Sequence, residues 1–424
     1  MIRKLKPKSE FTRNVLTLMT GTTIAQAIPI AISPILTRFY TPDDFGAFAL
    51  YISIVSIISG IATGRYELAI MLPKKDEDAI NIMFLSTVIA ITVSIVSFLV
   101  IAVFDKQIAD LLGKKEISLW LYFLPISVFL TSIYLNFNYF NIRKKQYSFT
   151  SKVIILQSST NATGNISFGW GNFHYAGLIL TNILTSIISL LYIVTKNREV
   201  FKQKIVPRRI RLVAKKYREF PFHTLPQTFI YEGVKQLPII FIKILFTFKT
   251  LGLFALANRV MVTPLSIVGN SLGQVYYEKA SAMYREDKNE LYIYTKNLFI
   301  KLILISTLVG SIIIIYLPIL FKLLFGEEWK EAGNIAQFLM IYLIYDFAIT
   351  PFSQLYLISS NNKFYLKWEI FRFMMLIVLF TLIYILNIND MDIFFLFFSL
   401  VHLCMYIIVS IPILKRNSII WREA

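Results

Sequence analysis

The chain has 424 residues, of which 56% are hydrophobic and only 16% are charged, and its formal net charge at pH 7 is +18. Soluble globular proteins carry about 25% charged residues, so this composition argues against a soluble protein. The basic charge does not indicate nucleic-acid binding, because it is spread over short segments between apolar runs instead of gathering on one face. We expect an all-α integral membrane protein without a soluble domain.

Apolar runs of about 20 residues recur along the whole chain, and each can cross a bilayer as a helix. We predict about twelve transmembrane helices, near Val15–Leu36, Phe45–Ala62, Ile80–Phe104, Leu119–Phe140, Val153–Trp170, Tyr175–Val194, Leu225–Phe246, Leu251–Leu272, Leu298–Leu317, Ala332–Ser353, Trp368–Ile388 and Ile393–Leu414. A cleaved signal peptide is the alternative for the first run, which contains an Ala25-Gln26-Ala27 triplet. The run continues well past this triplet, which favours a helix that stays in the membrane.

Most of the 43 Lys and Arg residues lie in segments that are cytoplasmic if the N-terminus is cytoplasmic. Basic residues concentrate in cytoplasmic loops, so this placement predicts that both termini are inside. The most basic segment, 196–220, has Ile210, Val213, Tyr217 and Phe220 on one helical face. This pattern predicts a basic amphipathic helix on anionic lipids of the inner leaflet. A linker helix between two halves is an interpretation that holds at the same time.

The two halves of the chain echo each other, as in many transporter folds. Three short matches keep their order: Phe45–Leu50 with Leu251–Leu256, Gly113 with Gly326, and Lys145 with Lys363. We therefore predict an N-terminal lobe (1–195), a basic cytoplasmic linker (196–220) and a C-terminal lobe (221–424). Six helices in each lobe would relate the lobes by a pseudo-two-fold axis along the membrane normal. Chance matching within apolar sequence is the alternative.

Polar residues inside the predicted spans give the candidate binding residues. The run Gln157–Asn165, with Asn161 and Asn165, would line a watered cavity that binds sugar hydroxyls, or would form hydrogen bonds between helices. Ionisable residues in a bilayer are costly and tend to face a wet interior. The candidates for binding an anion are Arg38, Arg65, Lys235, Arg259 and Lys301, and those for ion coupling are Glu67, Glu232 and Asp346. Glu232 and Lys235 are three residues apart and are expected to pair.

Signs of covalent chemistry are missing from the sequence. It contains no GxxxxGK[ST] phosphate loop. Its histidines, His174, His223 and His402, are scattered without the spacing of a metal site. No predicted outer loop is large enough for a glycosyltransferase or polymerase site. We expect a protein that is not an enzyme and that needs no cofactor or metal.

The segments LTRFYTPDDFGAFALY (Leu36–Tyr51) and ATGRYELAIMLPKKDEDA (Ala62–Ala79) resemble the signature region of Wzx-type polysaccharide flippases. These belong to the multidrug/oligosaccharidyl-lipid/polysaccharide (MOP) exporter superfamily. The second-half segment LGLFALANRV (Leu251–Val260) resembles the family's echo of that region. Arg38 corresponds to the arginine of the first segment, and Arg65 and Glu67 lie in the GRYELA stretch of the second.

This resemblance implies a multi-pass protein of the bacterial inner membrane with a V-shaped central cavity and a cationic lumen. It would move undecaprenyl-pyrophosphate-linked oligosaccharide, the repeat unit of lipopolysaccharide O-antigen or capsule, to the periplasmic leaflet by alternating access. Polysaccharide-assembly proteins and anionic membrane lipids are the other partners that we expect.

Three other function classes stay open. A cation-coupled drug exporter of the same superfamily would present carboxylates in its lumen, whereas this sequence favours lysine and arginine there. A membrane polymerase or ligase of the same pathway would need a long outer loop with catalytic residues. A receptor or scaffold without transport is the third alternative.

Overall fold

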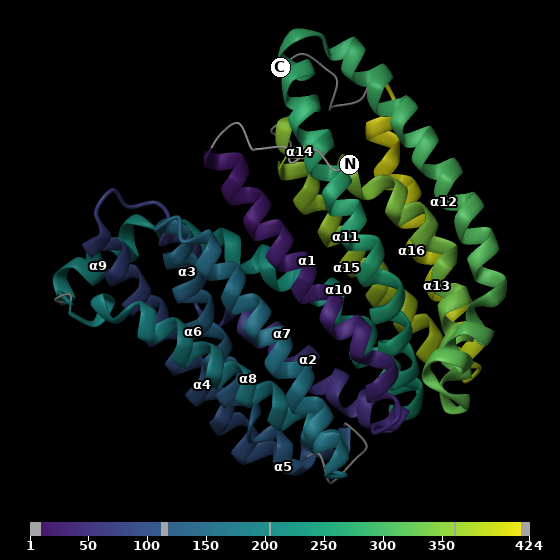
Figure 1. Cartoon of the computed structure of the whole chain (residues 1–424), viewed down its shortest axis with the longest axis horizontal. Coiled ribbons are helices and arrows are strands. Elements are labelled where there is room, and N and C mark those ends of the chain that lie inside the picture. Colours follow the sequence, from purple (N-terminus) through teal and green to yellow (C-terminus); the bar gives the residue numbers. More distant parts are fainter. Residues whose placement is uncertain (1–9, 112–117, 203–204, 360–361, 417–424) are drawn as a thin grey trace, which may run out of the picture. The chain divides into compact units, whose positions relative to one another are not determined.

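The computed structural model of the chain describes residues 10–111, 118–202, 205–359 and 362–416 (Figure 1). Within these residues the secondary structure is helical, without strands. The predicted loop residue Gly113 lies outside the described residues, as do the terminal segments 1–9 and 417–424. The predicted location of the two termini therefore stays a prediction.

Twelve helices of the described part have twenty or more residues and follow the order of the predicted spans. They are α1 (Glu10–Leu36), α2 (Pro42–Ala62), α4 (Asp76–Leu111), α6 (Leu124–Arg143), α7 (Tyr147–Trp170), α8 (His174–Lys196), α10 (Leu225–Leu245), α11 (Phe248–Glu286), α12 (Lys288–Phe325), α13 (Lys330–Ile349), α15 (Asn362–Ile385) and α16 (Met391–Leu414). Shorter helices are α3 (Tyr66–Ala69), α5 (Ser118–Leu121), α9 (Pro207–Lys216), α14 (Gln354–Ile358), the 3-10 helix η5 (Thr350–Ser353) and the π-helix η3 (Phe220–Thr224).

Ten of the helical spans are long and apolar enough to cross a membrane. The chain is therefore a multi-pass membrane protein. The two long helices that do not meet this standard are α7 and α10. They carry the polar run Gln157–Asn165 and the charged pair Glu232 and Lys235. These polar residues lower the mean hydropathy of α7 and α10, which is why the two helices are not among the ten apolar spans.

Several helices extend beyond the predicted spans. Helix α12 has 38 residues, which is about 57 Å at about 1.5 Å per residue and exceeds a hydrocarbon core of about 30 Å. An apolar run marks only the part of a helix that fits the hydrocarbon, whereas Lys and Glu continue a helix equally well beyond it. The third predicted span ends at Phe104, and α4 has a break in its helical backbone at that residue (φ −117°, ψ 20°).

The chain forms two compact units, Met1–Gln236 and Leu237–Ala424, with their boundary inside α10. Both matched segments FGAFAL and LGLFAL follow a threonine cap. Thr41 before α2 and Thr247 before α11 have extended backbones, and each side chain accepts a hydrogen bond from the third helical N–H. The two matched segments therefore begin their helices in the same way. The lobe bounds 1–195 and 221–424 and the symmetry axis stay predictions.

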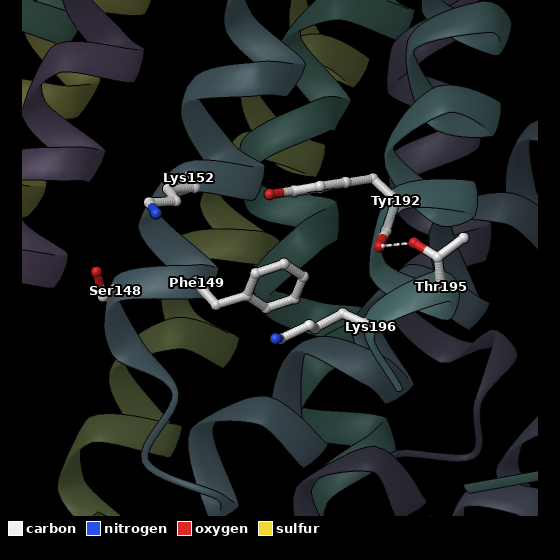
Figure 2. Close-up of a pocket in the computed structure, with 6 residues that line it drawn as sticks. All are labelled: Ser148, Phe149, Lys152, Tyr192, Thr195 and Lys196. Atoms are coloured by element: carbon white, nitrogen blue, oxygen red, sulfur yellow. Dashed lines mark hydrogen bonds between the residues drawn. The ribbon is translucent and has the colours of Figure 1, made fainter. Parts of the chain in front are cut away.

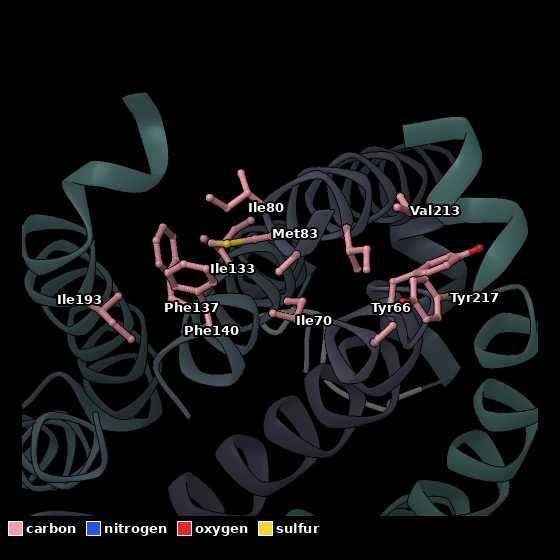
Figure 3. Close-up of a cluster of buried hydrophobic side chains, with 13 residues drawn as sticks. Tyr66, Ile70, Ile80, Met83, Ile133, Phe137, Phe140, Ile193, Val213 and Tyr217 are labelled. Atoms are coloured by element: carbon pink, nitrogen blue, oxygen red, sulfur yellow. The ribbon is translucent and has the colours of Figure 1, made fainter. Parts of the chain in front are cut away.

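In the first unit, α1 packs along α7, α7 along α8, and α4 along α6. An apolar cluster near the start of α4 includes Tyr66, Met83 and Phe137 (Figure 3). Val213 of α9 and the adjoining Tyr217 complete this cluster, and the hydroxyl of Tyr66 donates to the backbone oxygen of Ala214 at 3.1 Å.

The placement of α9 corrects the expectation that its apolar face lies in the inner leaflet. Val213 and Tyr217 of that face pack on protein side chains instead, and the hydrogen bond from Tyr66 to Ala214 holds the segment there. The basic side chains Arg208, Arg211 and Lys215 of α9 remain exposed.

In the second unit, α13 packs against α12, α11 and α16 (Figure 1). Helices α12 and α13 approach each other closely at Gly333. A β-carbon at this position would lie 2.5 Å from the Cα of Pro318 and 2.8 Å from the backbone oxygen of Leu317. Backbone atoms cannot move aside as a flexible side chain does, so glycine is required for this helix pair.

We expect Gly333→Ala to lower the stability of the protein by about 2 kcal/mol, because overpacking outweighs the better helix propensity of alanine. Thermal unfolding of the purified protein in detergent measures this. Gly273→Ala in α11 is the matched control, since its β-carbon would meet Pro351 at an ordinary 3.5 Å. Equal melting temperatures for the two variants would contradict the close approach at Gly333.

Candidate functional site

The turn between α1 and α2 is built by the segment that resembles the flippase signature. Thr41 caps α2, and the Asp44 carboxylate accepts the Thr41 backbone N–H at 3.0 Å while the Thr41 side chain accepts from Asp44. Pro42 occupies the first helical turn, where the lack of an N–H costs nothing. These residues form a capping box that fixes where α2 begins.

The same turn is tied to two further helices. The second carboxylate oxygen of Asp44 accepts the backbone N–H of Tyr175 in α8 at 2.9 Å. The hydroxyl of Tyr40 donates to the backbone oxygen of Asn165 in α7 at 2.8 Å, and both residues are buried. Arg38 is exposed and makes no ion pair with a described residue. Tyr40 and Asp44 therefore connect this turn to α7 and α8. Neither residue is among the site residues predicted from the sequence.

The GRYELA stretch forms the turn between α2 and α4. Gly64 (φ 62°) and Arg65 (φ 60°) both have left-handed backbones, which are uncommon for a residue other than glycine. Arg65 lies 2.9 Å from the carboxylate of Glu67, which is fully buried and also accepts the hydroxyl of Thr63. Arg65 is 20% exposed, and its Nε has no hydrogen-bond partner among the described residues. The pair thus stabilises the turn, while the guanidinium as a whole stays partly exposed.

The polar run of α7 faces its neighbours at some positions and open space at others. The Asn165 side-chain amide donates to the Asn161 oxygen at 2.9 Å, and the buried Asn165 oxygen has no partner among the described residues. A β-carbon at Gly164 would lie 2.7 Å from Thr181 of α8, so the two helices are in close contact there. Thr163 is exposed. The run thus contributes both to close helix packing and to an open polar surface.

Glu232 and Lys235 of α10 do not pair with each other as expected from the sequence. Glu232 is half-buried, and a β-carbon at Gly60 in α2 would touch its side chain at 3.1 Å. Lys235 is exposed, and its ammonium lies 4.4 Å from the ring centre of Tyr231. The expected ion pair between Glu232 and Lys235 is not formed. The contact of Glu232 with α2 and the cation–π contact of Lys235 take its place.

The second unit contains three candidates on three different helices. Arg259 of α11 is half-buried, Lys301 of α12 is exposed, and neither makes an ion pair with a described residue. Asp346 of α13 is half-buried and accepts the Thr350 hydroxyl at 3.2 Å. It is also hydrogen-bonded to Tyr406 of α16.

An internal ion pair lies near Asp346 in the same unit. Arg372 and Glu369 of α15 are 3.2 Å apart, and the Arg372 guanidinium lies 5.7 Å from the ring centre of Tyr406. Neither Glu369 nor Arg372 is among the site residues predicted from the sequence. Their spacing of three residues within one helix was the available signal. No cluster of His, Cys, Asp or Glu that could hold a metal ion occurs in the described part of the chain.

Residues 35–334 match the model of a family of polysaccharide biosynthesis proteins, which is more than half of the chain. The chain belongs to this family. None of the curated proteins matches the sequence. The segments Leu36–Tyr51 and Ala62–Ala79, which carry the resemblance to polysaccharide flippases, lie wholly inside the matched residues.

Solved structures of the MOP superfamily resemble the chain over nearly its whole length. An inward-facing multidrug resistance MATE family transporter is 16% identical, covers 96% of each chain and has a TM-score of 0.60. A MOP superfamily transporter from Pyrococcus furiosus is 13% identical, covers 97% of each chain and has a TM-score of 0.59. The lipid II flippase MurJ in an inward closed conformation is 12% identical, covers 93% of this chain and 98% of that chain, and has a TM-score of 0.65. This polysaccharide biosynthesis protein therefore has the MOP transporter fold, as the resemblance implied.

Proposed function

We propose that this protein translocates undecaprenyl-pyrophosphate-linked oligosaccharide from the cytoplasmic to the periplasmic leaflet of the bacterial inner membrane. The observation that carries the proposal is the combination of a polysaccharide biosynthesis family with a transporter fold made of membrane helices. A sugar head group cannot cross about 30 Å of hydrocarbon unaided, and a pyrophosphate adds a further cost of desolvation. A hydrated cationic cavity would remove both barriers while the lipid tail stays in the bilayer.

Arg259 and Lys235 are the residues that we assign to the pyrophosphate. Arg259 lies eleven residues after the start of α11, about 16 Å along the helix axis, and has no ionic partner among the described residues. An unpaired cation at that depth is costly unless it meets water or an anion. Asn161 would meet sugar hydroxyls, whereas the buried Asn165 would hold the Asn161 side chain in position through its amide, and Arg38, Arg65 and Lys301 would add to the positive field.

The membrane potential can drive this export without ATP. An inside-negative potential favours the outward movement of negative charge, and moving about two such charges outward gains about 4–5 kcal/mol per 100 mV. Among the candidates for ion coupling, Glu232 and Asp346 are half-buried, whereas Glu67 is already engaged with Arg65 and Thr63. We therefore place Glu232 and Asp346 ahead of Glu67 for this role. Transport that is unchanged when the proton and sodium gradients are collapsed separately would rule out coupling.

Reconstitution tests the function directly. Purified protein in liposomes should move a fluorescent pyrophosphate-linked oligosaccharide from one leaflet to the other, which is measured as protection from a membrane-impermeant quencher. Liposomes without protein and liposomes loaded with a cationic dye are the controls. Movement of the dye but not of the oligosaccharide would favour the drug exporter and overturn the proposal.

A further inference from the structure

A pocket lies at the end of the first unit where α7 begins and α8 ends. It has a volume of about 410 Å³ and is lined by Ser148, Phe149, Lys152, Tyr192, Thr195 and Lys196. Figure 2 shows the Phe149 ring between the lysine side chains, with Lys152 on α7 and Lys196 on α8. None of the site residues assigned above lines this pocket.

The pocket walls combine two cations with hydroxyl groups and aromatic rings. Neither Lys152 nor Lys196 makes an ion pair with a described residue. Phe149 and Tyr192 have ring centres 5.3 Å apart and form the apolar floor between the lysines. Ser148 belongs to the first turn of α7, where the helix dipole favours negative charge. The chemistry that fits these walls is a phosphate group attached to an apolar body.

An apolar stripe on α8 leads to the pocket. Leu184, Ile188 and Leu191 follow at helical spacing, and their exposed fractions are 43%, 41% and 60%. Tyr192, at 39%, continues the stripe into the pocket. In a membrane protein such a surface contacts lipid tails, and lysines at its end reach toward the headgroups.

We propose that this pocket binds the phosphate of an anionic membrane lipid, with Lys152 and Lys196 on the phosphate and the acyl chains along Leu184, Ile188 and Leu191. A lipid is favoured over a soluble anion because the apolar stripe is continuous with the pocket. The site is separate from the residues assigned to transport, and the proposal does not depend on the transported substrate.

Lipid binding to the purified full-length protein tests the proposal. Native mass spectrometry would follow the titration of phosphatidylglycerol, with zwitterionic phosphatidylcholine as the comparison lipid. We expect phosphatidylglycerol to bind about 30-fold more weakly to K152Q/K196Q. Each lysine near an anionic headgroup raises the affinity about fivefold, and the variant lacks two of them. The variant K152R/K196R keeps both charges and should retain binding.

Lys74 and Lys75 provide the matched control, because they are exposed and precede α4 in the same unit. K74Q/K75Q removes the same charge and should bind phosphatidylglycerol as the wild type does. Unchanged binding in K152Q/K196Q, or an equal loss in K74Q/K75Q, would overturn the proposal. Binding of inorganic phosphate that depends on Lys152 and Lys196, together with no binding of phosphatidylglycerol, would also overturn it and would indicate a soluble anion. Melting temperatures without added lipid establish that each variant is folded.

Discussion

Export of surface polysaccharide is expected to stop when Arg259 or Lys235 is replaced by alanine, while the amount of protein in the membrane stays normal. Removing one partner of a desolvated charge pair costs about 2–5 kcal/mol, which is at least about a 30-fold loss of transport. Complementation of an export-deficient strain, with surface polysaccharide and membrane protein measured on the same cells, tests this.

Two variants separate a local role of these residues from a general loss of charge. Arg259→Lys keeps a cation but loses the planar fork that binds phosphate oxygens, so we expect partial export. Lys322→Ala removes a cation whose ammonium is 2.6 Å from Glu327 at the end of α12, so export should be normal. Normal export in both Arg259→Ala and Lys235→Ala would remove the cationic-cavity mechanism.

Glu67→Ala should lower the stability of the protein by about 3 kcal/mol, the low end of the cost of breaking a buried ion pair. It leaves Arg65 with an uncompensated charge in a left-handed turn and takes the acceptor from the Thr63 hydroxyl. Thermal unfolding in detergent measures the change. Glu67→Gln keeps the shape and an acceptor for Thr63, so its melting temperature should lie between those of the alanine variant and the wild type.

The exposed ion pair between Glu77 and Arg209 is the comparison for Glu67. Exposed pairs are screened by water and contribute little, so Glu77→Ala should melt with the wild type. If Glu67→Ala also melts with the wild type, the Arg65–Glu67 pair does not hold the turn. Glu67 would then return to the first rank of candidates for ion coupling.

The transmembrane helices could be predicted from the sequence because an apolar run long enough to cross hydrocarbon leaves few other structures open. The ends of α11 and α12 lie beyond the apolar runs and were missed, although Asp287 caps the start of α12 and Gly326 follows its end. The spacing of Val213 and Tyr217 also predicted the apolar face of α9 correctly. Sequence periodicity does not tell, however, whether lipid or protein covers such a face. Tertiary packing decided this in favour of Tyr66 and α4.

The sequence allowed us to predict which polar and charged residues lie within the helices. It did not allow us to predict which side chains contact one another. The Glu232–Lys235 interaction followed from helical spacing alone, and it is not formed, since the Lys235 ammonium lies over the Tyr231 ring and Glu232 lies against α2. Tyr40 and Asp44 were missed although the T-x-x-D capping box before an apolar run was readable around Thr41. Their partners, Asn165 and Tyr175, are more than 120 positions away, and a single sequence does not reveal contacts of that range.

The fastening of α9 to the start of α4 limits where this protein can flex. Segment 205–217 is held by the buried side chains of Val213 and Tyr217 and by the Tyr66–Ala214 hydrogen bond, so it is not a flexible linker. Any hinge at the entrance to α10 then falls on the short stretch around the π-helix Phe220–Thr224, whose wider turn already departs from regular helix geometry. Stiffening these few positions should slow a conformational cycle without touching a charged residue.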